Sequence, residues 1–496
     1  SVRRARRPSR RPRGDVREGK RRGSVLIGPV SIGTIDQWEV GPGSVVSWHP
    51  SAASRAKAQE APVSPVPPGY MQAQHIRGFS DYAAKGLDYS RLMIASYDSP
   101  GQCDVRTMTY VINAHVRRHD TYRSRFEYQG DEIVRHTMEN ASHIKMAPTK
   151  HGELSAEQFR DLIRSTPPPV EWDCFSFGIV QKADSFTFYM SLDHVHADAQ
   201  FLGVALMEFH LMYVALVNGN PPLRLPESTS YLDFCVRQRE YTGALTLESP
   251  EIKVWTEFAD HNGGSFPTFP LPLGDSLVPC PGELVTHELM NADQTSRFEQ
   301  ACSAGGARFI GGVFAALGVA ERELSGADTY YGLTPTDTRE PEELMTLGWF
   351  TGLVPLTVPV TGSFADAAKA AQVSFDSGRE ASRVPFDRVL ELADWLERPR
   401  AAFPQVNYFD VGLPPLSAFL TSDLSGANIG MYFDGRLSNP LCFWVVRLQH
   451  QTMVTVLYPG NPVARESIET YVKAVRSVFL RVAEGRDVTV SELTKA

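Results

Sequence analysis

Apolar and polar positions alternate most clearly in residues 185–194. The apolar members of one parity are Phe186, Phe188, Met190 and Leu192. A period of two is typical of a β-strand with one buried face, and His194 takes the next position on that face. The pattern then changes, because residues 201–217 form a long apolar stretch that predicts a helix. An imidazole is therefore expected where a buried strand ends and a helix is about to begin.

The rest of the chain mixes strand and helix patterns. Another alternating run, 172–181, is separated from the first by Lys182-Ala183-Asp184, which predicts a hairpin. In the second half, the predicted elements are helices within 292–324, strands at 329–335 and 352–360, a hairpin at 441–458 and a closing helix at 465–482. Strands and helices in both halves predict an α/β or α+β fold of two subdomains. The polar stretch 223–230 places the boundary between residues 25–225 and 226–496.

Composition narrows the class of protein. The chain has 496 residues, 42% hydrophobic and 21% charged, which is enough for two or three ordinary globular units. Six scattered cysteines without CxxC spacing favour a reducing compartment and neither a zinc site nor a disulfide framework. No apolar run is long enough and free of charge to predict a membrane span. Residues 201–217 come closest, but Glu208 and His210 interrupt them, so we expect a core helix.

Residues 1–24 differ in character from the rest. The first 22 hold eleven Lys or Arg against Asp15 and Glu18, so they carry +9 and the remainder carries −17. A basic arm of this kind can contact nucleic acid or anionic lipid. We favour a disordered or misassigned upstream extension and expect no nucleic-acid partner.

His194 and Asp198 form the first candidate site. The spacing HxxxD is expected about once by chance in a chain with this many histidines and aspartates, so it carries little weight by itself. A histidine at the end of a buried strand, followed within one turn by a carboxylate, suits a general base. The alternative is a satisfied core histidine. His196 is a second candidate base, although it lies beyond the point where the alternation stops.

A resemblance decides between these readings. Residues 193–199, Asp-His-Val-His-Ala-Asp-Ala, resemble the HHxxxDG signature of the superfamily of condensation domains and chloramphenicol acetyltransferase-like enzymes. Asp193 stands in place of the first His and Ala199 in place of the Gly. Other blocks resemble the superfamily's further motifs in the same order. They are Gln72 in the first motif, 118–126, 334–339, 348–355 and 384–389.

The resemblance is closest to the mycobacterial polyketide-associated acyltransferases that build trehalose lipids. It is carried by residues 47–50, 117–122, 172–175, 267–274 and 348–355. It implies two chloramphenicol acetyltransferase-like subdomains in a V with the active site at their seam. It also implies transfer of a long acyl chain from coenzyme A or a phosphopantetheine carrier to a hydroxyl of trehalose or of a sulfated or acylated trehalose.

Roles for single residues follow from the same resemblance. His194 matches the catalytic histidine, and Asp198 and Arg339 match a structural salt bridge across the seam. The substitution at Asp193 leaves open what the first His would do. Trp349 and Phe350 either wall the site or belong to an aromatic core. We also expect Asn407 to present its amide to the acceptor or to the oxyanion.

The chemistry needs little else. A neutral imidazole can take the proton of a sugar hydroxyl as it attacks the thioester, and can return it to the departing thiolate. We therefore expect no metal, no cofactor and no acyl-enzyme. We expect a cytoplasmic monomer, with peripheral contact at the inner face of the plasma membrane and a polyketide synthase as a candidate partner.

Two other functions stay open. One is an amide-forming condensation domain, against which we count the lack of a carrier or adenylation module after residue 496. The other is a non-catalytic scaffold for a polyketide synthase. The intact set of His194, Asp198 and Arg339 counts against it.

Overall fold

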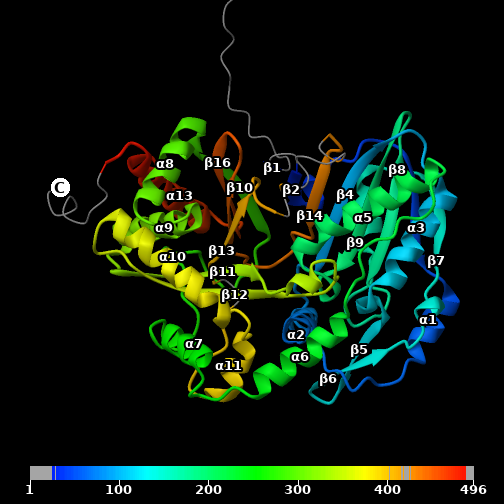
Figure 1. The fold of residues 1–496 in the computed structure, drawn as a ribbon, viewed down its shortest axis with the longest axis horizontal. Coiled ribbons are helices and arrows are strands. Elements are labelled where there is room, and N and C mark those ends of the chain that lie inside the picture. The colour runs from blue at the N-terminus through cyan, green and yellow to red at the C-terminus, as the bar shows by residue number, and fades with distance from the viewer. Residues whose placement is uncertain are drawn as a thin grey trace, which may run out of the picture.

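Two lobes lie side by side in the computed structural model (Figure 1). The structure describes residues 25–27, 30–400, 403–414, 417, 424 and 426–486. The extension expected at residues 1–24 lies outside the described residues.

An eight-stranded sheet forms the first lobe. In spatial order its strands are β1 (Val25–Ile27), β2 (Val30–Thr34), β14 (Ile429–Phe433), β4 (Leu92–Pro100), β9 (Ser185–Asp193), β8 (Phe175–Gln181), β3 (Ser44–Pro50) and β7 (Met146–Glu153). The strands β8 and β9 form the antiparallel hairpin that the sequence predicts. The strand β14 comes from the second half of the chain and pairs parallel to β2 and antiparallel to β4. The first sheet is thus not built from residues 25–225 alone, and the boundary at 225/226 stays a prediction.

Both faces of this sheet are buried at its central strands β8 and β9. Helices α3 (Val105–Arg118) and α5 (Ala199–Val217) share a core with the apolar parity of β9. On the other face, Tyr189 packs edge-on against Trp38 and against Phe159 of α4 (Ala156–Arg164), with ring centroids 6.0 and 5.4 Å apart. The expectation of one buried face for residues 185–194 was therefore wrong, because α4 and the Trp38 segment cover the second face.

Helix α5 is the core helix that the sequence predicts. Asp198 caps its first turn by accepting a hydrogen bond from the backbone N–H of Phe201 at 3.2 Å. Among the described residues it is the one unbroken helix long and apolar enough to cross a membrane, and 56% of that apolar window is buried inside the protein. Helices α8 (Ala292–Ala304) and α9 (Phe309–Ser325) meet the same criterion only as a pair, which is bent by 95°.

A four-stranded sheet forms the second lobe. In spatial order its strands are β10 (Gly282–Asn291), β16 (Gln451–Pro459), β15 (Cys442–Arg447) and β13 (Gln405–Asp410). The predicted hairpin at 441–458 is present as β15 and β16. The helices that share its core are α8, α9, α10 (Phe364–Ala381) and α13 (Pro462–Ala483).

The remaining elements join or flank the lobes. The hairpin of β11 (Thr329–Asp337) and β12 (Thr351–Pro359) runs toward the first lobe, and α2 and α6 lie where the lobes meet (Figure 1). The other elements are α1 (Ala52–Gln59), α2 (Tyr70–Ala84), β5 (Ser124–Gln129), β6 (Glu132–Thr137), α6 (Tyr231–Gly243), α7 (Pro250–Asp260) and α11 (Phe386–Leu392).

Candidate active site

His194 begins a short 3₁₀ turn, η4 (His194–His196), directly after β9. Its backbone N–H donates to the carbonyl of Arg91 at 2.8 Å, which fixes the turn to the start of β4. The Nδ1 atom of its ring is buried and has no hydrogen-bond partner among the described residues. The side chain as a whole is partly exposed. Since Nδ1 is buried, Nε2 is the nitrogen left for a substrate.

Trp349 stacks on His194 from the second half of the chain. The two ring centroids are 3.7 Å apart, and the ring planes meet at 21°. Trp349 therefore contacts the imidazole directly, which agrees with the expected role of a residue that walls the site. Phe350 points into a buried group with Tyr231 and Phe234, at centroid distances of 5.3 and 4.4 Å, and belongs to the aromatic core.

The surroundings keep His194 uncharged at neutral pH. Burial is the main cause that lowers its pKa to about 4, and the nearby His75 acts in the same direction. The backbone carbonyl of His194, then Asp198 and Asp193, oppose this shift without cancelling it. A neutral imidazole is the form that can accept a proton.

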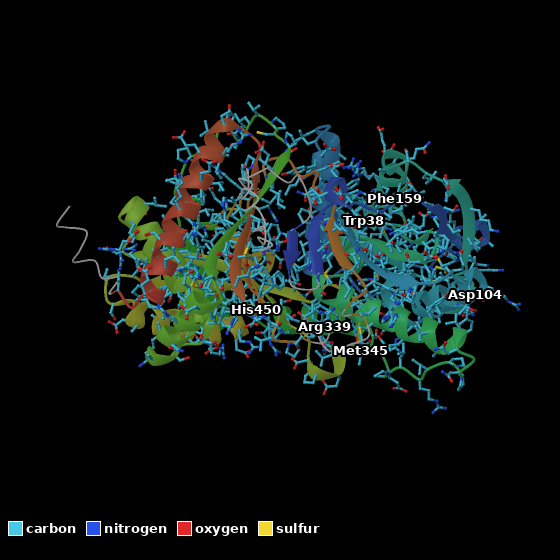
Figure 2. All side chains as sticks on the ribbon, turned by 90° about the horizontal axis from the view of Figure 1, so that it is seen from above. Trp38, Asp104, Phe159, Arg339, Met345 and His450 are labelled. Atoms are coloured by element: carbon cyan, nitrogen blue, oxygen red, sulfur yellow. The ribbon has the colours of Figure 1, made fainter. Side chains whose placement is uncertain are left out.

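Asp198 and Arg339 form the ion pair across the seam that the sequence predicts. Nη1 of Arg339 lies 3.1 Å from Oδ1 and 2.9 Å from Oδ2 of Asp198, and each side chain is only 2% exposed. Seen from above, Arg339 lies between the two lobes (Figure 2). The backbone N–H of Phe350 donates to Oδ2 of Asp198 at 3.0 Å. The carboxylate therefore binds both the start of α5 and the segment that carries Trp349.

Arg339 also binds the segment that precedes Trp349. Its Nη2 donates to the carbonyls of Thr346 and Gly348 at 3.1 and 3.3 Å, and its Nη1 also reaches Asp337 at 3.1 Å. A backbone bond of 3.1 Å joins the N–H of Asp198 to the carbonyl of Gly348. These bonds fix the position of Trp349 relative to His194.

A second histidine lies beside the first. His75 on α2 is 4% exposed, and its Nε2 lies 2.8 Å from Oδ1 of Asp193. Oδ2 of Asp193 accepts a bond from Arg91 at 3.2 Å. The sequence interpretation did not select His75. The available signal was the replacement of the family's first His by an acidic residue, which a nearby base can pair with.

Comparison with known proteins shows the family of this chain. The profile of the condensation-domain family matches residues 84–402, well over half of the chain. This chain belongs to the condensation-domain family. It is 56% identical over 463 residues to the acyltransferase PapA3 of Mycobacterium tuberculosis, covering 93% of this chain and 98% of the relative. The 2'-acyl-2-O-sulfo-trehalose (hydroxy)phthioceranyltransferase PapA1 of Mycobacterium tuberculosis is also 56% identical, with 93% and 90% covered.

Solved structures agree on the fold. A PapA2 acyl transferase matches with a TM-score of 0.87 and 50% identity, covering 91% of this chain and 99% of that one. The first condensation domain of the calcium-dependent antibiotic synthetase matches with a TM-score of 0.63 and 16% identity over 85% and 98%, which shows the fold alone. The mixed α/β condensation-domain fold and the membership among acyltransferases are thereby confirmed.

Two residues expected at the site of this condensation-domain chain lie elsewhere. His196 is 1% exposed, and its Nδ1 is 3.0 Å from the hydroxyl of Thr121 among the rings of Tyr122 and Phe175. The amide nitrogen of Asn407 is 3.2 Å from Sγ of Cys442 and donates to the carbonyl of Phe443 at 3.1 Å, both on β15. The structure therefore does not support His196 or Asn407 as residues lining the site, because core and sheet contacts occupy them.

A buried group behind α5 has the residue types of a metal site. One ligand atom each from His115, His119 and Glu208 lies within 4.8 Å of the others. The carboxylate already has a counter-charge, since Nε of Arg118 lies 3.5 Å from its Oε1. Burial would raise the pKa of Glu208, but the hydrogen bonds from His115 and His119 outweigh it and lower that pKa to about 2. The group is thus a charge-balanced cluster within the first lobe, in which Nε2 of His119 lies within hydrogen-bond distance of Oε2 of Glu208, at 3.2 Å.

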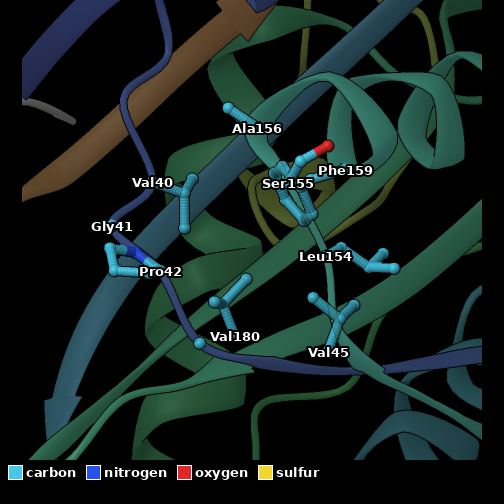
Figure 3. A pocket seen from close by; sticks show the side chains of 10 residues that line it. Val40, Gly41, Pro42, Val45, Leu154, Ser155, Ala156, Phe159 and Val180 are labelled. Carbon is cyan, nitrogen blue, oxygen red and sulfur yellow. The ribbon is translucent and has the colours of Figure 1, made fainter.

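A separate pocket opens at the far side of the first sheet (Figure 3). Its walls are mainly apolar, and none of the residues discussed above for the site lines it. The residues that line the pocket are Val40, Gly41, Pro42, Gly43, Val45, Leu154, Ser155, Ala156, Phe159 and Val180. No charged side chain lines this pocket, so nothing in it is suited to activate a thioester or a hydroxyl.

Proposed function

We propose that this protein moves a long acyl chain from a thioester to a hydroxyl of trehalose, or of a sulfated or acylated trehalose. The names of its relatives support this proposal. PapA1 is named as an acyltransferase of a sulfo-trehalose, and PapA2, 50% identical over 461 residues, as a trehalose-2-sulfate acyltransferase. The donor in this proposal is coenzyme A or the phosphopantetheine arm of a carrier, which in the second case makes a polyketide synthase the partner.

The observation that carries the proposal is the arrangement of His194. Its Nδ1 is buried, its pKa is lowered to about 4, and Trp349 fixes its ring plane. In the proposed step, Nε2 takes the proton of the sugar hydroxyl while that oxygen attacks the thioester carbonyl. The tetrahedral intermediate then breaks its C–S bond, and the imidazolium returns the proton to the departing thiolate. Atoms and charge balance without a further reactant.

We propose that no acyl-enzyme forms. The thiols of Cys174 and Cys235 are buried, and burial raises the pKa of each above its usual value. Burial likewise raises the pKa of Cys302 to about 12. Uncharged thiols are poor nucleophiles, so direct transfer to the hydroxyl is favoured.

A thiol-release assay tests the function. The full chain is mixed with a long acyl chain on coenzyme A or on a phosphopantetheine carrier. The acceptors, tested in parallel, are trehalose, trehalose 2-sulfate and an amine, and products are identified by mass spectrometry. We expect an acylated sugar and stoichiometric thiol. An amide product would favour the amide-forming condensation domain instead, and no turnover with any acceptor and with either CoA- or carrier-bound donor would favour the scaffold.

The role of His194 needs its own control. We expect His194→Ala to remain folded, with a free energy of unfolding lowered by about 0.5–1.5 kcal/mol through loss of the stack on Trp349. We expect it to lose at least about a hundredfold in kcat/KM, the lower end of what general-base catalysis contributes. His151→Gln, on β7 at the outer edge of the sheet, is the matched control and keeps activity. A folded His194→Ala variant with wild-type turnover would refute the base assignment.

Place and assembly remain proposals. We propose a cytoplasmic monomer that makes peripheral contact with the inner face of the plasma membrane. Fractionation of expressing cells and light scattering of the purified chain test these two statements separately.

A further inference from the structure

The helix α2 is fixed against the catalytic turn. The side-chain amide of Gln72 donates to the carbonyl of Val195 at 2.9 Å, and its oxygen accepts bonds from Arg135 at 2.9 Å and from the backbone N–H of Gly69 at 3.0 Å. Gln72 is fully buried. His75, one turn further along α2, is therefore fixed beside η4 by a completely paired side chain rather than by a mobile loop.

Asp193 determines how His75 is oriented. The carboxylate accepts three bonds, from His75 at 2.8 Å, from Arg91 at 3.2 Å and from the backbone N–H of Val195 at 3.0 Å. Burial would raise the pKa of Asp193, but His75 and Arg91 outweigh it and hold that pKa below its usual value. An ionised carboxylate only accepts hydrogen bonds, so Nε2 of His75 carries a proton. This is the one hydrogen bond of His75 among the described residues.

Three rings then meet at the site. The ring of His75 lies 5.9 Å from that of His194 and 5.4 Å from that of Trp349, centroid to centroid. A proton on Nδ1 of His75 would place a positive charge beside His194 and disfavour a second one there. Asp193 stabilises that charge, as the carboxylate of a histidine–carboxylate pair does.

We propose that His75, oriented by Asp193, is a positioning residue of the acyl transfer that supports the His194–Trp349 stack and sets the protonation equilibrium of His194. The inference rests on the proposed function, because it assumes that His194 is the base. The charged and titratable groups that face the two imidazoles from the elements around them are Asp193 at the end of β9, Arg91 before β4, Tyr89 after α2, Asp198 at the start of α5 and, through Asp198, Arg339 after β11.

The test replaces His75 by glutamine, whose amide still donates to Asp193 but carries no charge. The pH profile of kcat/KM is compared for the wild type, His75→Gln and the control His151→Gln. We expect the acidic limb of His75→Gln to move up by about one pH unit, as removal of a like charge about 6 Å away predicts, while the control stays unmoved. A merely structural role would lower kcat/KM equally at every pH.

A second readout does not depend on turnover. The ¹³Cε1 signal of His194, assigned from its loss in His194→Ala, is titrated in the wild type and in His75→Gln, with His75→Asn as the substitute if the glutamine variant does not fold. In His75→Gln we expect the midpoint of the His194 titration to rise by the same number of pH units as the acidic limb of the kcat/KM profile. If neither moves while His194→Ala is inactive, only this inference falls. If His194→Ala keeps its turnover, the assignment of His194 as the base falls and this inference falls with it. If the wild type turns over no acceptor, the proposed function falls, and the ¹³C titration still decides whether the imidazoles are coupled.

Discussion

The indole of Trp349 lies flat against the imidazole of His194, with 3.7 Å between the ring centroids and 21° between the planes. The two residues are far apart in sequence and come from the two halves of the chain. Their stack therefore depends on the seam between the lobes. It couples the orientation of the proposed base to the packing of the second half.

Replacing Trp349 tests whether the stack matters for turnover. An aromatic pair contributes about 0.5–1.5 kcal/mol beyond buried area, so losing it should free the imidazole and reduce kcat/KM about tenfold. We expect this loss in Trp349→Leu and a smaller one in Trp349→Phe, which keeps a ring. Thiol-release kinetics measure both, with Phe234→Leu as a control in the neighbouring aromatic group. Equal activity of the Leu and Phe variants would argue against an orienting role.

Asp198 should matter more for stability than Asp337, although both bind Arg339. Asp198 is nearly fully buried and also accepts two backbone bonds, whereas the side chain of Asp337 is 18% exposed. Removing one partner of a buried ion pair costs about 3–5 kcal/mol. We expect a loss of that size in the free energy of unfolding for Asp198→Ala and a smaller one for Asp337→Ala, both measured by urea denaturation. The reverse order would show that Asp337, and not Asp198, is the principal partner of Arg339.

Local patterns predicted much of this site, and long-range contacts account for what they missed. The strand before His194 and the apolar helix after it follow from periodicity, and the motif resemblance supplied Arg339 as the partner of Asp198. Burial of Tyr189 could not be predicted, because the helix that covers its face of the first sheet, α4, comes from a different part of the sequence. The pairing of β14 with β2 and β4 was missed for the same reason, since a short strand carries no signal for a distant partner.

The role of Asp193 was missed for a different reason. Its substitution for the family's first His was visible, but its partner His75 lies on another element, and only the fold shows that they meet at 2.8 Å. His196 and Asn407 illustrate the opposite error. His196 was assigned to the site because it lies within the motif, and Asn407 because it lies on an expected strand. The fold instead buries His196 in the core, with its Nδ1 beside Thr121, and gives the amide of Asn407 partners in the second sheet.

The free energy of unfolding should decrease as the pH is lowered below about 6.5. Burial is the main cause that lowers the pKa of His115, His194 and His196 to about 4 each, from an ordinary value of 6.5. Between these values the unfolded chain binds the protons and the folded chain does not, so acid favours unfolding. Each histidine contributes at most about 1.4 kcal/mol per pH unit, and the destabilisation fades above pH 6.5 as the histidines of the unfolded chain lose their protons.

Urea unfolding at pH 7.5, 6.5 and 5.5 measures this effect. From three histidines we expect a loss of about 1 kcal/mol between the first two values and of about 3 kcal/mol between the last two. A variant of an exposed histidine, His450→Gln, should lose the same amounts of unfolding free energy over these pH steps as the wild type. A free energy of unfolding that stays constant down to pH 5.5 would contradict burial of the three neutral imidazoles.

Gly348 should tolerate no side chain. A Cβ at this position would fall within the ring of Tyr231, which is fully buried and donates its hydroxyl to the carbonyl of Trp349 at 3.2 Å. Overpacking of this kind costs about 1–3 kcal/mol. Because the displaced segment carries Trp349, we expect Gly348→Ala to lose activity along with stability.

The matched control for Gly348→Ala is Gly243→Ala at the end of α6, where a Cβ meets nothing within 4 Å. We expect that control to match the wild type in kcat/KM and to have an unfolding free energy equal to that of the wild type or higher by up to about 1 kcal/mol, because alanine favours a helix more than glycine does. Tyr231→Ala added to Gly348→Ala removes the ring that the new methyl group meets, so the double variant should lose less than the two single losses combined. Strict additivity would mean that the clash with Tyr231 does not cause the losses of Gly348→Ala.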